Sequence, residues 1–145
     1  MFKLMDRGGV KGALIYTVYR NGVPIEHVEE KNLVVNGGRR RLAELISGHS
    51  TDFVTQIGFG TGTREPELTD VILDDLQTID ITDSVVDGTS VTFNWYLDQT
   101  HCNGMNITEF ALFAADGLML THQQRGRNIG KESDVTVRGQ YILTF

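Results

Sequence analysis

Apolar and polar residues alternate with a period of two in several short segments, the pattern expected of half-buried β-strands. Residues 90–97 show it most clearly, because their apolar side chains share one face: Val91, Phe93, Trp95 and Leu97. The other predicted strands are residues 13–20, 23–28, 53–59, 76–84, 108–114, 118–123 and 135–145. Tight hairpin turns are expected at three Asx-Gly pairs: Asn21-Gly22, Asp87-Gly88 and Asp116-Gly117.

The hairpin of residues 13–28 is expected to be peripheral. Pro24 has no N–H to donate to a strand ladder, which is typical of an edge strand. At the other end, Phe145 is in phase with the apolar face of the closing strand, so we expect it to be built into the sheet.

One segment has the period of a helix instead. Asn36 is a potential N-cap, Gly48 a potential stop, and Leu42, Leu45 and Ile46 fall on one face between them. The sequence therefore predicts a mainly-β fold: an antiparallel β-sandwich with one short α-helix packed at an edge or end. Residues 1–145 are expected to form a single domain.

Arg39, Arg40 and Arg41 crowd the first turns of the predicted helix, where positive charge opposes the helix dipole. Either they meet an acidic partner, or they are solvated and paired with nearby carboxylates: Glu29, Glu30 and Glu44.

Composition excludes several classes of function. The formal net charge of −6 argues against a nucleic-acid binder. No window approaches the 18 or so apolar residues that cross a membrane. Residues 1–9 lack the apolar stretch of a secretory signal, so we expect synthesis in a cytoplasm.

No motif predicts a catalytic, metal or cofactor site, so we expect neither an enzyme nor a small-molecule substrate. The glycines of residues 58–63 precede a proline and three carboxylates where a phosphate loop needs a helix, and a tight turn fits them better. The four histidines are scattered without metal-ligand spacing, and Cys102 has no identifiable base. The acidic loop of residues 64–76 is interpreted as a docking rim, and a hydrolase using its carboxylates stays as an alternative.

Three segments carry a family resemblance. Residues 31–48 fit the pattern N-x-V-x-N-x-G…L-A…L…G, residues 56–66 fit I-x-x-G-x-G-x-x-x-P, and residues 107–117 fit I-x-E-x-x-L-F-x-x-D-G. In this order they resemble the small β-rich modules of tailed-bacteriophage tail-fibre and baseplate proteins. The resemblance covers roughly residues 31–145.

The resemblance implies a non-enzymatic structural subunit of a phage virion. In fibre proteins such a module precedes a repetitive shaft, whereas this sequence ends at Phe145. We therefore expect a tail, baseplate or collar component that connects or anchors fibres, forming a homo-oligomer and contacting other phage structural proteins. The expected interface residues are Asn21, Arg39, Arg40, Arg41, Glu65, Glu67, Asp70, Asp74 and Asp75.

A carbohydrate- or receptor-binding module is the alternative. Trp95 and Tyr96 point to opposite faces of their strand, so at most one of them belongs to an exposed surface. Trp95 is in phase with the apolar face and is expected in the core. Tyr96 is then the candidate for an exposed binding residue.

Overall fold

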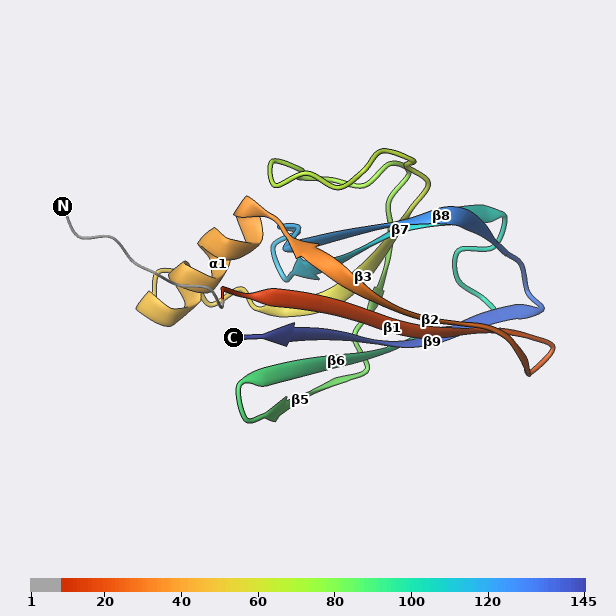
Figure 1. The fold of residues 1–145 in the computed structure, drawn as a ribbon, viewed down its shortest axis with the longest axis horizontal. Helices are drawn as coiled ribbons and strands as arrows, with labels where there is room; N and C mark the ends of the chain where they lie inside the picture. Colours follow the sequence, from red (N-terminus) through yellow and green to blue (C-terminus); the bar gives the residue numbers. More distant parts are fainter. Residues whose placement is uncertain (1–8) are drawn as a thin grey trace.

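The computed structural model describes residues 9–145, which form nine β-strands and one α-helix (Figure 1). The strands are β1 (Lys11–Arg20), β2 (Val23–Val34), β3 (Val54–Gly60), β4 (Gln77–Asp80), β5 (Asp83–Asp87), β6 (Ser90–Leu97), β7 (Met105–Ala114), β8 (Thr121–Lys131) and β9 (Val135–Thr144); the helix is α1 (Asn36–Ser47). The predicted mainly-β class with one short helix is confirmed. Residues 1–8, which bear on the expectation about a secretory signal, lie outside the described residues.

The strands form one antiparallel sheet in the order β4-β3-β7-β8-β2-β1-β9-β6-β5, and this sheet folds over on itself. β2 makes one connection between the layers, since it pairs with β1 over most of its length and with β8 through Leu33 and Val34. The chain crosses back at Ile81 and Thr82, whose N–H groups donate to carbonyl groups of β3 and β6, respectively. The result is a sandwich of two continuous layers.

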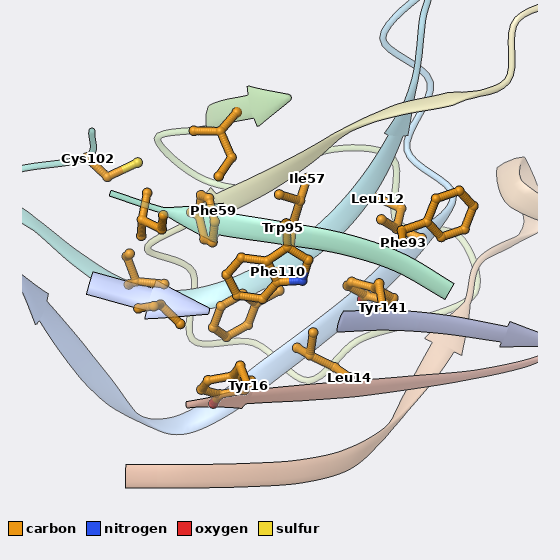
Figure 2. Close-up of a cluster of buried hydrophobic side chains, with 14 of the residues drawn as sticks. Leu14, Tyr16, Ile57, Phe59, Phe93, Trp95, Cys102, Phe110, Leu112 and Tyr141 are labelled. Atoms are coloured by element: carbon orange, nitrogen blue, oxygen red, sulfur yellow. The ribbon is translucent and has the colours of Figure 1, made fainter. Parts of the chain in front are cut away.

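Aromatic side chains from both layers meet in the core (Figure 2). The ring centroid of Phe59 on β3 lies 5.6 Å from that of Trp95 on β6 and 5.8 Å from that of Phe110 on β7. Tyr16 on β1 packs 4.9 Å from Phe110. These tilted and edge-to-face contacts are favoured by the ring quadrupoles, and they join the two layers. Trp95 is buried, as its position in the alternation predicted.

The first hairpin is not peripheral, which corrects the expectation from Pro24. Its turn at Asn21-Gly22 is as predicted, with φ of 50° and 77°. However, β1 lies in the middle of the sheet, paired with both β2 and β9, and buries Leu14, Tyr16 and Val18. Only the outer strand behaves as an edge: most of β2 is exposed, and the described residues give it no second backbone partner before Leu33. Pro24 therefore gives information on β2, the strand that contains it, and none on the position of β1, the strand that pairs with it.

The helix lies at one end of the sandwich (Figure 1) and differs in detail from its prediction. Val35 occupies the N-cap position without a side-chain cap, and Gly48 ends the helix at φ 76° as expected. Ile46, predicted on the buried face, is exposed. The helix instead docks through Gly38. A Cβ at this position would overlap the Leu120 carbonyl group in the connection between β7 and β8, so glycine is what allows the close approach.

Several strand boundaries also differ, and β2 continues to Val34, beyond the predicted end at residue 28. The predicted strand of residues 76–84 is divided into β4 and β5, because the chain changes layers between them. The predicted strand of residues 118–123 begins later and continues to Lys131 as β8. At the C-terminal end β9 alternates as predicted, and the Phe145 N–H donates to the Thr89 carbonyl while its side chain is exposed.

Candidate interface site

A buried histidine fastens the acidic loop of residues 61–76 to the sheet. His122 on β8 has its Nδ1 atom 2.7 Å from Asp70 Oδ2 of the loop and its Nε2 atom 2.8 Å from Glu109 Oε1 of β7. The side chains of His122, Asp70 and Glu109 are 2%, 7% and 5% exposed. The imidazole ring therefore bridges the two carboxyl groups, and both of its nitrogens take part in hydrogen bonds. Hydrogen bonds in which one partner is ionised are stronger than those between neutral groups.

Glu109 also binds the backbone at both ends of this loop. Its Oε2 atom accepts hydrogen bonds from the Gly62 N–H at 2.8 Å and the Asp74 N–H at 3.1 Å. A Cβ on Gly60 or Gly62 would overlap the Glu109 carboxylate, which explains the glycines of this segment without a phosphate ligand. The Thr108 hydroxyl donates a hydrogen bond of 2.6 Å to the Gly62 carbonyl, which adds a further contact between β7 and this end of the loop.

Asp70 therefore sits inside the molecule, contrary to the expectation that it faces a partner. Burial raises the pKa of its carboxyl group, but hydrogen bonds from the Glu67 N–H and from His122 outweigh burial and leave that pKa below its ordinary value. The other predicted carboxylates of the loop, Glu65, Glu67, Asp74 and Asp75, are exposed.

The loop, the start of α1 and the β7–β8 turn enclose a hollow of about 520 Å³. We call it the α1–loop hollow, and its lining includes Asn36, Gly37, Arg40, Leu68, Asp70, Val71 and Leu118. A hydrogen bond of 2.8 Å from the Asn36 N–H to the Leu68 carbonyl ties the helix to the loop. The hollow thus brings together Arg40 and Asp70, two of the residues predicted at an interface.

Apolar side chains stand exposed beside this hollow. Val71 and Ile72 are 75% and 61% exposed, and Leu68 next to them is also exposed. Arg40 on α1 lines this hollow, and Arg39 on the helix and Glu65 and Glu67 on the loop are further exposed charges of these two elements. An apolar centre with a charged surround is the usual composition of a protein–protein contact.

The three arginines separate into two roles. Arg39 and Arg40 are exposed, and Arg40 lies 4.0 Å from Glu44, one of the carboxylates considered as its neighbours. Arg41 is buried, which corrects its prediction as an interface residue. Its Nη1 and Nη2 atoms donate to the two oxygens of Asp116 at 2.8 and 2.7 Å, and Nη1 also reaches the Asp52 carbonyl. This bidentate pair locks α1 to the β7–β8 turn and lowers the pKa of Asp116 to about 2.

Asn21 does not belong to this site. It lies in the β1–β2 turn at the opposite end of the sandwich from α1 (Figure 1), where its N–H donates to the Asp134 carbonyl. Asp75 is turned to the other side of the loop, accepting a hydrogen bond of 2.6 Å from the Thr61 hydroxyl.

Sequence reasoning missed Glu109, His122 and Asp116. The available signal for Glu109 was a single charge inside the apolar segment 107–114, which predicts a buried carboxylate that needs a partner. The partner itself could not be read from the sequence, because His122 is 13 residues from Glu109 and 52 residues from Asp70 along the chain.

Cys102 is buried, and burial raises the pKa of its thiol, which disfavours the thiolate that a cysteine nucleophile requires. Within residues 9–145, no group of three or more His, Cys, Asp or Glu side chains is arranged to hold a metal ion. None of the described helices is long and apolar enough to span a membrane.

Comparison of the chain with protein-family models, with curated proteins and with solved structures finds no match.

Proposed function

We propose that the chain is a non-enzymatic structural subunit of a tailed-bacteriophage particle, in a tail, baseplate or collar position where it connects or anchors fibres. The order of the three sequence motifs supports the phage setting. The mainly-β fold fits a module of this kind, although many other functions use such a fold.

The observation that carries the assembly role is the exposed apolar surface at the α1–loop hollow. Val71 and Ile72 lie on a loop that His122 and Glu109 hold in place from inside, so this apolar surface is fixed in shape before any partner arrives. Burying such side chains contributes about 25 cal/mol per Å² of apolar area. A preorganised surface loses little conformational entropy on binding.

A second copy of the chain is a fitting partner for this surface. The start of α1 supplies exposed positive charge, and the loop supplies exposed negative charge beside the same hollow. Two copies related by a twofold axis can therefore place the arginines of each beside the carboxylates of the other. Exposed charges that the second copy leaves uncovered can contact other structural proteins of the particle.

The test is the absolute mass of the full chain by size exclusion with light scattering over a concentration series. We expect a defined oligomer that Val71→Asp shifts toward monomer, because a charge would be buried in the contact. Val86→Asp on β5 is the matched control, since Val86 is 78% exposed and lies away from the hollow. A monomer at every concentration, or equal effects of the two variants, would contradict the proposal.

A further inference from the structure

A second hollow, of about 540 Å³, lies on the outer face of the layer formed by β1, β9 and β6. We call it the outer-face hollow. Strand pairing sets its side chains in order: Tyr96 is opposite Arg138, and Asn94 is opposite both Gln140 and Asp83. The intervening residues, Trp95 and Gly139, are buried on the core side of the same strands.

Arg138 presents an unused set of hydrogen-bond donors in this hollow. Its Cζ atom lies over the Tyr96 ring, 4.5 Å from the ring centroid, within the range of a cation–π contact. Among the described residues, no carboxylate or carbonyl group accepts a hydrogen bond from Arg138. A planar guanidinium with free N–H groups is matched in geometry by a carboxylate, which it binds through two parallel hydrogen bonds.

The neighbouring side chains suit hydroxyl groups. The Gln140 side-chain amide donates to Asn94 Oδ1 at 3.1 Å, which leaves the Asn94 amide protons and the Gln140 carbonyl oxygen for a ligand. Asp83 lines the same hollow, and its carboxylate has no hydrogen-bond donor within residues 9–145. The site therefore combines one cation, one anion, two half-used amides and an exposed aromatic ring on a flat sheet.

We propose that the outer-face hollow binds a saccharide that contains a uronic acid. Arg138 takes the carboxylate of the sugar, while Asp83, Asn94 and Gln140 take its hydroxyl groups. A neutral sugar leaves the guanidinium group without its partner, and an inorganic anion offers no array of sugar hydroxyl groups to Asp83, Asn94 and Gln140. This proposal does not depend on the assembly role of the α1–loop hollow, because the two surfaces share no residue.

The chain carries its own reporter for this test. Trp95 is the single tryptophan of the sequence, and its indole packs beneath Gly139, where a Cβ would overlap the ring. Its fluorescence is followed while the full chain is titrated with galacturonate, glucuronate and mannuronate oligomers. Neutral xylose oligomers of the same length and inorganic phosphate are the comparison ligands, and calorimetry is the second readout.

We expect saturable binding of a uronate oligomer that Arg138→Gln weakens by about tenfold to a hundredfold, as the loss of a charged hydrogen-bond pair predicts. Arg20→Gln, which removes an exposed arginine at the end of β1, should leave the affinity unchanged. Circular dichroism confirms that both variants fold. The proposal is overturned if no uronate oligomer gives saturable binding in either readout. Equal affinity of the Arg138→Gln variant, of the neutral oligomers or of phosphate overturns it as well.

Discussion

His122 holds together two carboxylates that reach it from different parts of the chain, Glu109 in the neighbouring strand and Asp70 in the acidic loop. All three side chains are almost fully buried, so each charge relies on the others in place of water. Replacing an entire buried network by apolar residues can be neutral, whereas removing one member leaves an uncompensated charge. His122 is the member that contacts both carboxyl groups.

We therefore expect His122→Gln to lower the free energy of unfolding by about 3–5 kcal/mol, the usual cost of breaking a buried ion pair. Glutamine can donate to one carboxylate but not to both. Urea denaturation monitored by Trp95 fluorescence measures the change. His49→Gln is the control, since His49 is exposed.

The double variant His122→Gln with Glu109→Gln separates charge from packing. If the network is the cause, the two substitutions are coupled, and the double variant loses less than the sum of the single ones. If His122→Gln lowers the free energy of unfolding no more than His49→Gln does, the network contributes nothing to stability.

The docking of α1 combines a close backbone approach, an ion pair and hydrogen bonds to neighbouring segments. Gly38 lets the helix approach the Leu120 carbonyl group, and Arg41 binds Asp116 of the β7–β8 turn through two hydrogen bonds. Leu42 and Leu45 are only partly buried, and Ile46 is exposed, so the apolar face of the helix adds little. The attachment of this helix is unusually dependent on charge.

This dependence predicts an effect of pH. The pKa of Asp116 is about 2 in the folded protein, below the 3.8 of an ordinary aspartate, because Arg41 donates to it. A lowered pKa means that the pair stabilises the fold fully above about pH 4 and loses this contribution as the pH falls toward 2. Asp116→Asn should thus be less stable than the parent chain at neutral pH, with the difference shrinking between pH 4 and pH 2.

Stability curves in urea at several pH values provide the measurement. Asp87→Asn is the matched control, because Asp87 also precedes a glycine in a hairpin turn and is exposed. An Asp116→Asn difference that stays constant from pH 7 to pH 2, or one shared by Asp87→Asn, would rule out the ion pair as its source.

The sequence pattern was enough to predict most of the strands and the helix. It was enough to predict few of the pairings and contacts between them. The alternation in β6 and the Asx-Gly turns depend on neighbouring residues, so the strands, the hairpins and the burial of Trp95 were predictable. The prediction from Pro24 misplaced the first hairpin, because the part of β2 that contains this proline pairs with β1, and β1 is central in the sheet. The division between β4 and β5 depends on which layer each half meets, which no local pattern contains.

The residues of the candidate site were likewise predictable only where their surroundings depend on residues close in the sequence. Arg39 and Arg40 were predictable as exposed, since a charged helix start with no apolar neighbour stays in water. Arg41 looks identical in the sequence, and its burial depends on Asp116, which is 75 residues away. Asp70 and His122 were likewise assigned by residue type alone, and only the fold shows that they face each other inside the protein.

Seen as one body, the molecule keeps its two hollows apart, one beside α1 and one on the outer face of β6 and β9. The end that carries α1 has rigid apolar residues and both signs of charge, as self-assembly requires. The outer face of β6 and β9 has a hollow whose polar side chains are set in order by strand pairing, and a few such polar groups are what orients a small ligand. A subunit with this division can assemble through one surface and still leave the other open.

The assembly proposal makes its sharpest prediction when two charge-reversed chains are mixed. Arg39→Glu with Arg40→Glu makes both sides of the contact acidic, and Glu65→Arg with Glu67→Arg makes both sides basic. Each variant alone should remain monomeric, because like charges then face each other across the twofold contact. Mixed in equal amounts, each basic side meets an acidic one in both halves of the contact, and the oligomer should return.

Light scattering of the two variants and of their mixture reads the result directly, and added salt should weaken the recovered complex because exposed charges are screened. Arg41 is left untouched in this design, since its loss would release α1 and confuse unfolding with loss of contact. A mixture that stays monomeric while the parent chain is oligomeric would place the contact elsewhere, on the edges of β4 or β5. An oligomer that forms only in the mixture requires that the arginines of one copy meet the carboxylates of the other. Nonspecific apolar association would appear in each variant alone, and the folding of either variant does not depend on the other.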